Sequence, residues 1–377
     1  MTLITYLTRV HFADGILEEA LWSELESANK TRPLIVAEDI HLESEEGERF
    51  LSSFPVRTQT TKFTKIPHIP TEDAVRKVAD LYEESGCDVV LAFGSSRAID
   101  LAKVARISIA HSDDLATFSY KQGGSYRIGT NLPMLFAVPG ISGFGSAVSA
   151  HAPVILSSGE RTLVMCKKLI PTVTICDPTL TLKSTEEQTA SAGANAITNC
   201  VEAYLSKSYN PPAEGIALDG LARAISNLSL ALKDHNSVQA RREMMAASLN
   251  GALALQKGLG ATQAISNALE TVSDKALDHG TVNRVVLPEV LRFNQKYTHD
   301  KFCTLRRIFG LEKDDCVAGG VNEYFNSLPL PTKLSDLGLN VDQLRVAATV
   351  ASNDIATNTN PRQVGVVDYL DIMRSVH

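Results

Sequence analysis

The stretch "CDVVLAFGSSRAIDLAKVARISIA", residues 87–110, decides the fold class of this chain. Its first eight residues are mostly apolar, which is typical of a strand buried on both faces. A turn at Gly94 follows, and residues 97–110 have the apolar spacing of a helix. A strand, a tight turn and a helix in this order predict one unit of a parallel sheet covered by helices.

The remainder of the first half repeats this order of elements. Further predicted segments are the strands 33–40, 133–140 and 172–178 and the helix 72–86. Parallel sheets of this kind bind ligands at the carboxyl ends of their strands. We therefore predict an α/β, Rossmann-like nucleotide-binding domain over residues 1–178.

The second half has a different character, because long Ala- and Leu-rich helical patterns replace the strands after Pro178. The predicted helices are 186–207, 213–233, 238–256 and 259–275, with shorter ones beyond. No further strand is predicted. We therefore predict an all-α domain over residues 179–377, which agrees with the two domains expected of a chain of 377 residues.

Composition narrows the function to small-molecule chemistry. Hydrophobic residues make up 44% and charged residues 21%, as in folded proteins. A net charge of −7 argues against nucleic-acid and anionic-membrane partners, which bind basic surfaces. The six cysteines are scattered without a CxxC pair, and neither a signal peptide nor an apolar run of membrane-spanning length is evident. We expect a cytoplasmic protein with reduced cysteines.

Three segments have the residue types of a ligand site. The turn 92–103 opens a helix, where amide N–H groups and the helix dipole favour phosphate. The loop 138–149 is rich in Gly and Ser, so its backbone can approach a ligand closely. As bare motifs, both are also compatible with ordinary loops that bind nothing, and for the turn this structural alternative is favoured by about two to one.

The third segment set lies in the helical half and is polar where apolar packing is expected. Asn195 and Asn199 are four residues apart and share a helix face, with Glu202 on the same side. Taken singly, each residue of the set can be a satisfied core or helix-end residue. The set as a whole is Asn195, Asn199, Gln263, Asn267, His279 and Asn283.

Several motifs together resemble the iron-containing alcohol dehydrogenase superfamily, and within it the maleylacetate reductase branch. They are "DPTLTLKSTEEQTASAGANAITNCVEAY" (177–204), "EGIALDGLARAI" (214–225), "GLGATQAISNALE" (258–270), "HGTVNRVVLPEVLRFN" (279–294) and "NPRQV" (360–364). The resemblance covers essentially the whole chain. It implies a dehydroquinate synthase-like fold and an active site in a cleft between an N-terminal nucleotide-binding domain and a C-terminal helical domain.

Departures from the family pattern concern its metal site. The resemblance implies one Asp and three His ligands, and these positions hold Asn195, Asn199, Gln263 and His279 here. Iron and zinc need carboxylate, imidazole or thiolate ligands, and neutral amides do not replace them. We therefore expect no catalytic metal. The maleylacetate reductase branch also implies several histidines in the cleft, of which His279 remains.

The dinucleotide loops also depart from the family pattern. The resemblance implies cofactor contacts at Gly94, Ser95, Ser96, Arg97, Asp100, Lys103, Ser142, Gly143, Gly145 and Ser146. Two glycines of the family's GGGS loop are serines here. If either position needed a positive φ, the serine would cost roughly 1–2 kcal/mol. Glu38 or Asp39, after the second strand, suits a ribose diol and repels a 2′-phosphate, so NADH is expected in preference to NADPH.

Three functions remain open at this point. The first is a metal-independent, NADH-dependent reductase of a small ketone or keto acid, with His279 as proton donor and Arg97, Lys103 or Lys168 as cations for a carboxylate or phosphate. Lys103 has a structural alternative in pairing with Asp100. The second is a lyase, dehydratase, isomerase or cyclase that has lost metal and dinucleotide use. The third is a non-catalytic binding protein. Relatives of this fold also suggest a homodimer.

Overall fold

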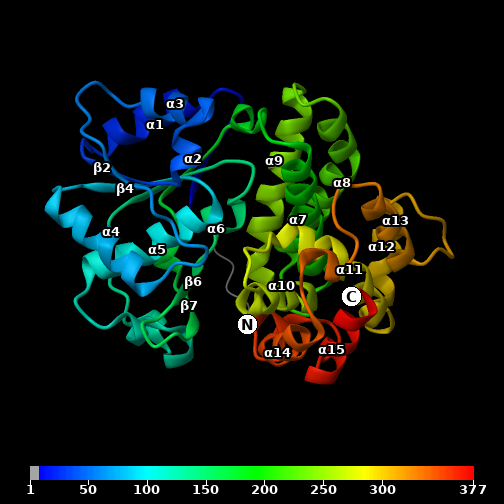
Figure 1. Ribbon diagram of the computed structural model, residues 1–377. Coiled ribbons are helices and arrows are strands. Elements are labelled where there is room, and N and C mark those ends of the chain that lie inside the picture. Colours follow the sequence, from blue (N-terminus) through cyan, green and yellow to red (C-terminus); the bar gives the residue numbers. More distant parts are fainter. Residues whose placement is uncertain (1–7) are drawn as a thin grey trace. The chain divides into compact units, whose positions relative to one another are not determined.

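The computed structural model describes residues 8–377 and divides into two compact units, one ending at Leu182 and the other spanning Lys183–His377 (Figure 1). The division falls four residues after the predicted domain boundary. In the described part of the chain, no helix is both long and apolar enough to cross a membrane. All six cysteines are free.

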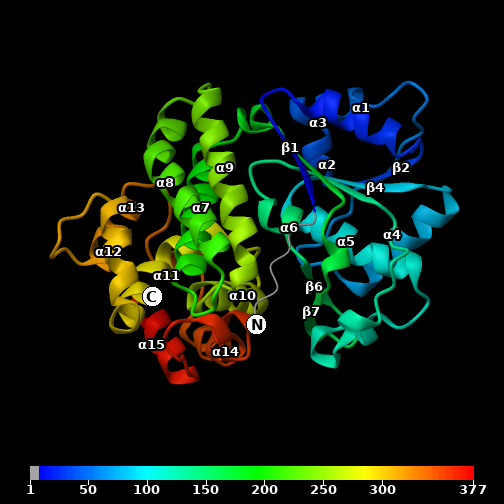
Figure 2. The same ribbon diagram turned by 180° about the vertical axis from the view of Figure 1, so that it is seen from behind.

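A six-stranded parallel sheet forms the first unit, with the order β1-β8-β5-β4-β2-β3. Its strands are β1 (Arg9–Phe12), β2 (Pro33–Val36), β3 (Thr61–Phe63), β4 (Val89–Gly94), β5 (Leu135–Pro139) and β8 (Val173–Cys176). Figure 2 shows β1 from behind. The register pairs Gly94 with Pro139, so β4 and β5 end at the same level. The predicted parallel sheet is confirmed.

Alternating side chains of these strands pack under helices on the two faces of the sheet. Val90 and Ala92 share a core with α4 (Glu72–Glu84) and α5 (Ser96–Ala110). Leu91 and Phe93 share the opposite core with α1 (Leu17–Ser27) and α3 (Glu45–Ser52). Burial on both faces is the reason that these strands read as continuous apolar runs.

Three features of this unit differ from the prediction. The antiparallel hairpin of β6 (His151–Ile155) and β7 (Arg161–Met165) lies outside the main sheet and was not predicted. The edge strands β1 and β3 were also missed. The strand predicted over 33–40 ends at Val36, because the polar residues 39–42 form a short helix, α2 (Asp39–Leu42).

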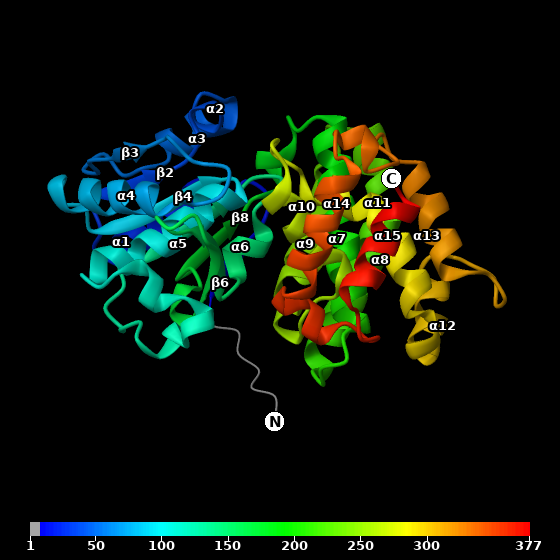
Figure 3. The same cartoon turned by 60° about the horizontal axis from the view of Figure 1, so that its bottom comes forward.

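The second unit is helical throughout its described residues, as predicted (Figure 3). Its helices are α7 (Glu186–Leu205), α8 (Pro211–Lys233), α9 (Val238–Ala254), α10 (Ala261–Val272), α11 (His279–Asn294), α12 (His299–Ile308), α13 (Val317–Asn326), α14 (Val341–Ser352) and α15 (Val366–Ser375). One core joins α7, α8, α9 and α13, and a second joins α10, α11, α14 and α15. A capping box of Thr185 and Gln188 starts α7, which carries the polar stripe of Asn195, Asn199 and Glu202.

Candidate functional site

The polar stripe of α7 lies against neighbouring helices at three levels. At the first level, Asn195 accepts a hydrogen bond at Oδ1 from Asn283 Nδ2 of α11, over 3.0 Å. Asn283 is fully buried and in turn accepts from the Ser266 hydroxyl of α10. At the second level, Asn199 is 9% exposed, and a methyl group at Gly251 of α9 would lie 3.2 Å from its Cβ. The amides therefore sit where helices approach closely.

Glu202, the third level of the stripe, holds the N-terminus of α10. Its carboxylate accepts hydrogen bonds from the backbone N–H groups of Gly260, Thr262 and Gln263 at 3.0, 2.7 and 3.1 Å. These are among the helix-start N–H groups that have no partner within the helix, and a negative charge suits this end of the dipole. Burial nevertheless raises the pKa of Glu202, which these hydrogen bonds lower in part. The contact fixes where α10 begins and so where Gln263 lies.

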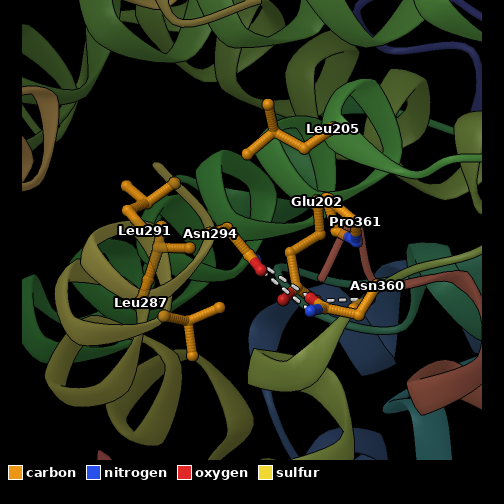
Figure 4. A pocket seen from close by; sticks show the side chains of 9 residues that line it. Glu202, Leu205, Leu287, Leu291, Asn294, Asn360 and Pro361 are labelled. Carbon is orange, nitrogen blue, oxygen red and sulfur yellow. Dashed lines mark hydrogen bonds between the residues drawn. The ribbon is translucent and has the colours of Figure 1, made fainter. Parts of the chain in front are cut away.

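A small pocket lies beside Glu202 and is lined mainly by apolar side chains, among them Leu205, Leu287 and Leu291 (Figure 4). At its wall, the amides of Asn294 and Asn360 bind each other reciprocally at 2.9 and 3.0 Å. Both are almost fully buried. No charged or titratable group other than Glu202 lines this pocket, which indicates a packing defect between helices and not a substrate site.

His279, the histidine retained in the predicted set, is held by one amide and one carboxylate. Its Nδ1 lies 3.3 Å from Nε2 of Gln263, and its Nε2 lies 3.4 Å from a carboxylate oxygen of Glu270. Gln263 also donates to Asn267 Oδ1 at 2.9 Å, and Asn267 donates to Asp354 Oδ2 at 3.0 Å. These five side chains form one polar cluster within the helical unit, in which hydrogen bonds link His279, Gln263, Asn267 and Asp354.

Two carboxylates of this cluster were missed from the sequence. Glu270 follows Gln263 by seven residues and Asn267 by three, a spacing that places all three on one face of α10. The sequence therefore did contain a signal for Glu270. Asp354 comes from the segment after α14, and nothing in its local sequence indicates that it contacts Asn267.

The donors around His279 do not match those of a transition-metal site. Asn195 directs its oxygen at Asn283, and Gln263 presents its nitrogen, which has no lone pair to give, to the imidazole. Across residues 8–377, no group of three or more His, Cys, Asp or Glu side chains is placed to hold a metal ion. Iron and zinc need several anionic or imidazole ligands converging on one point, so this donor set does not fit them.

In the α/β unit, the two predicted dinucleotide loops meet at the ends of β4 and β5. Gly94 has φ +93° and Gly143 has φ +101°, a backbone region that favours glycine. The Gly140 N–H donates to Gly94 O at 2.9 Å, and a methyl group at Gly143 would lie 3.1 Å from the same oxygen. Gly143 is therefore required by its positive φ and by the close approach of the loops, and Gly94 by its positive φ and the nearby His41 ring.

The two serines that replace family glycines are unstrained. Ser95 has φ −86° and caps α5 by accepting the N–H of Ala98, and Ser96 is helical. The strain considered for these serines is therefore absent, because neither position has a positive φ. The bulky Phe144 is buried at 4% exposure.

The acidic residue at the end of β2 that contacts the phosphate loop is Glu38. It accepts from the Ser95 hydroxyl, lies 3.1 Å from Nδ1 of His41, and its carboxylate is 3.8 Å from Nε of Arg97. Burial raises the pKa of Glu38, but the hydrogen bonds from His41 and Ser95 outweigh it and lower the pKa below its ordinary value. Asp39 is exposed at the start of α2.

The remaining predicted cofactor residues divide into exposed and buried groups. Ser142 and Arg97 are exposed, whereas Gly145 is partly and Ser146 almost fully buried. Lys103 is fully buried, where it donates to Ser149 Oγ and His151 O at 3.0 Å each and pairs with Asp100 at 3.5 Å. Lys103 thus has the structural role that was its alternative. Lys168 binds Ile128 O.

Comparison with known proteins identifies relatives over the whole chain. The family model "Iron-containing alcohol dehydrogenase" matches residues 8–178, and "Fe-containing alcohol dehydrogenase family, C-terminal" matches residues 189–377. A 4-hydroxybutyrate dehydrogenase of Cupriavidus necator is 37% identical over 98% of both chains. These matches bear on function as well as fold, because the relatives are named as dehydrogenases.

Solved structures of similar fold include two reductases. A sulfoacetaldehyde reductase of Bifidobacterium kashiwanohense, in complex with NAD+, has a TM-score of 0.88 at 21% identity over 100% of this chain and 98% of its own. A maleylacetate reductase of Agrobacterium tumefaciens has a TM-score of 0.80 at 19% identity with the same coverage. Maleylacetate reductases are therefore among the structural neighbours, although others have higher TM-scores.

Proposed function

The chain belongs to the iron-containing alcohol dehydrogenase family and is an oxidoreductase; from that premise we propose that it interconverts a small carboxylated carbonyl compound and its alcohol with NAD(H), without a metal. The observation that carries the metal-free part is that Gln263 and Glu270 present an amide N–H and a single carboxylate to His279, where several anionic or imidazole metal ligands would be required. NADH supplies the hydride when bound.

The loops at the carboxyl edge of the sheet fit a dinucleotide. Gly94 and Gly143 let the two loops approach each other closely beside the N-terminus of α5, where a pyrophosphate is favoured. Glu38 is an acceptor for ribose hydroxyls and would repel a 2′-phosphate, which supports NADH over NADPH. The NAD+ complex of the sulfoacetaldehyde reductase supports the same choice of cofactor.

The chain's own contribution to the reaction is hydrogen bonding and proton transfer. When hydride adds to the carbonyl carbon, the electron pair of the C=O bond moves onto oxygen and an alkoxide forms. His279 donates a proton from a ring nitrogen to that oxygen and regains one from water. Asn195 and Asn283 keep α7 and α11 in fixed register beside it.

The relative's name supports a carboxylated substrate. The Cupriavidus necator protein is a 4-hydroxybutyrate dehydrogenase, and 4-hydroxybutyrate is an alcohol with a carboxylate. We propose that the substrate of this protein also carries a carboxylate, and we do not extend the length of the carbon chain from the relative. The matched pair 4-hydroxybutyrate and 1,4-butanediol tests this, because the second compound replaces the carboxylate with another alcohol.

Nucleotide binding is tested first, by thermal unfolding with increasing NADH or NADPH. A ligand that binds only the folded state at one hundred times its Kd stabilises it by about 2.7 kcal/mol, so a saturating rise in Tm with NADH is expected. Glu38→Gln should reduce the preference for NADH over NADPH, whereas the exposed Glu43→Gln should not. Absence of any response to millimolar nucleotide would overturn the redox proposal in favour of non-redox chemistry on this scaffold.

Turnover is then measured after dialysis against a chelator. We expect NAD+-dependent oxidation of 4-hydroxybutyrate to exceed that of 1,4-butanediol and to be unchanged by chelation or by added Fe²⁺ or Zn²⁺. His279→Ala should abolish it. Activity that is lost on chelation and restored by one of these metals would refute the metal-free mechanism while leaving the oxidoreductase assignment intact.

A further inference from the structure

The carboxylate of Asp354 fixes the direction of a chain of hydrogen bonds that ends at His279. Its Oδ1 is held by the backbone N–H of Ala356 at 2.8 Å, and its Oδ2 accepts from Asn267 Nδ2 at 3.0 Å. A carboxylate accepts hydrogen bonds and has none to give. Asn267 must therefore turn its NH₂ group toward Asp354 and its oxygen away.

That orientation is passed on by Gln263. Since Asn267 presents oxygen, Gln263 donates to it through Nε2 at 2.9 Å. The same nitrogen lies 3.3 Å from Nδ1 of His279, and an NH₂ group has a second hydrogen for that contact. Nδ1 must then be the acceptor, which leaves the ring proton of a neutral imidazole on Nε2. Nε2 faces Glu270 Oε2 at 3.4 Å, so a carboxylate oxygen lies near that proton.

We propose that Asp354 and Glu270 are positioning residues that hold His279 as the neutral tautomer protonated at Nε2. Asp354 acts through Asn267 and Gln263, and Glu270 acts directly. This inference rests on the proposed function in that His279 is the proton donor there, and it names the nitrogen from which the proton leaves.

The direction of the hydrogen bonds from Asp354 to His279 is hard to reverse, because the amides of Asn267 and Gln263 would have to turn together. Presenting the Gln263 oxygen to Nδ1 would turn its NH₂ away from Asn267 and bring two amide oxygens together. Relieving that repulsion by turning Asn267 would in turn place its oxygen against the carboxylate of Asp354. The N–H donated to Nδ1 also stabilises electron density on the ring, which favours release of the Nε2 proton to an alkoxide. A neutral imidazole that acts in this way has precedent among isomerases.

The contact of His279 Nε2 with Glu270 is compatible with release of the Nε2 proton. A hydrogen bond between a ring N–H and a carboxylate is normally shorter than 3.4 Å, so Glu270 orients the Nε2–H group without binding it tightly. Oxygen of a reacting carbonyl can therefore compete for the same proton. Glu270→Gln retains an acceptor oxygen and is expected to keep the tautomer, whereas Glu270→Leu is expected to loosen the ring orientation.

The test is nitrogen NMR of the full-length protein with ¹⁵N-labelled histidine, since protonated and unprotonated ring nitrogens have well-separated shifts. His279→Gln identifies the signals of that ring among the nine histidines. In the wild type we expect an unprotonated Nδ1 and a protonated Nε2. Gln263→Glu places a carboxylate oxygen at Nδ1 and should move the proton there or protonate both nitrogens. Asp354→Asn should give a mixture of tautomers.

Controls separate this inference from folding and from the proposed function. The exposed Asp342→Asn on α14 should leave the His279 signals unchanged, and circular dichroism shows whether each variant is folded. Since the readout needs no substrate, it stands even if turnover is never found; if turnover is found, Asp354→Asn should lower kcat about tenfold with little change in KM. A wild-type ring protonated at Nδ1, or signals unaltered in folded Gln263→Glu, would overturn the proposal.

Discussion

Replacing Glu202 by Gln removes one oxygen from a carboxylate that satisfies three backbone N–H groups at the start of α10. Oε2 serves Gly260 and Gln263, and Oε1 serves Thr262. A glutamine can keep its oxygen on the first pair, but its NH₂ group then opposes the Thr262 N–H. An unsatisfied buried N–H costs about 1–3 kcal/mol, and the two remaining bonds lose roughly half their strength with the charge.

A neutral side chain offsets part of this loss, because burial disfavours the charged carboxylate. The net expectation for Glu202→Gln is a decrease of about 2–4 kcal/mol in the unfolding free energy of the helical unit. The matched control is Glu323→Gln, an exposed position in α13 that should change stability by less than about 0.5 kcal/mol.

Urea unfolding followed by two probes measures this effect. Far-UV circular dichroism reports mostly on the helices, whereas fluorescence of the single tryptophan, Trp22 in α1, reports on the α/β unit. The dichroism midpoint should shift in Glu202→Gln. A variant whose dichroism transition stays within the range of the Glu323→Gln control would show that the helix start is satisfied without the carboxylate, and the account of the stripe would fail.

Two further substitutions test the α/β unit. Gly94→Ala imposes φ +93° on a residue with a Cβ, and that Cβ would lie 2.6 Å from Nδ1 of His41. We therefore expect the unfolding free energy, measured in urea, to fall by at least about 1–2 kcal/mol, and NADH binding, measured by thermal shift, to weaken. Unchanged stability would mean that the loop relaxes freely. Burial lowers the pKa of Lys103 to about 8 from 10.5, so between these pH values the unfolded chain binds more protons than the folded one. As the pH rises from 8 to 10.5, the unfolding free energy of the wild type should therefore increase by up to roughly 3 kcal/mol relative to that of Lys103→Met. If the unfolding free energies of the two proteins changed with pH in parallel, this expectation would be contradicted.

The fold was predictable where burial on both faces made the strands uniformly apolar. Strands β4, β5 and β8 and helices α7 to α10 were predicted to within a few residues for that reason and because capping residues mark the helix starts. Strands β1 and β3 have only four and three residues and carry polar side chains, RVHF and TKF. Their pairing with β8 and β2 is a tertiary effect that no local pattern reveals.

Most residues of the candidate site could be predicted from the sequence, but the hydrogen bonds between them could not. The contact of Asn195 with Asn283 joins residues 88 positions apart, and the hydrogen bond of Asn267 to Asp354 joins residues 87 positions apart. Residue types at positions 195, 199 and 263 are amides where the family resemblance implies metal ligands. They do not indicate which amide atom faces which neighbour, because this depends on a carboxylate that lies outside every motif.

Amides at these positions do something that histidines cannot. Gln263 Nε2 donates to Asn267 and to His279 at once, and among neutral side chains only an amide NH₂ group has two hydrogens on one atom. An imidazole nitrogen in that place has one hydrogen or one lone pair, so it could bind a metal or one neighbour but could not orient both. Under our proposal, Gln263 therefore joins two neighbours by hydrogen bonds at a position where the family resemblance implies a metal ligand, and it ties the protonation of His279 to the fixed charge of Asp354.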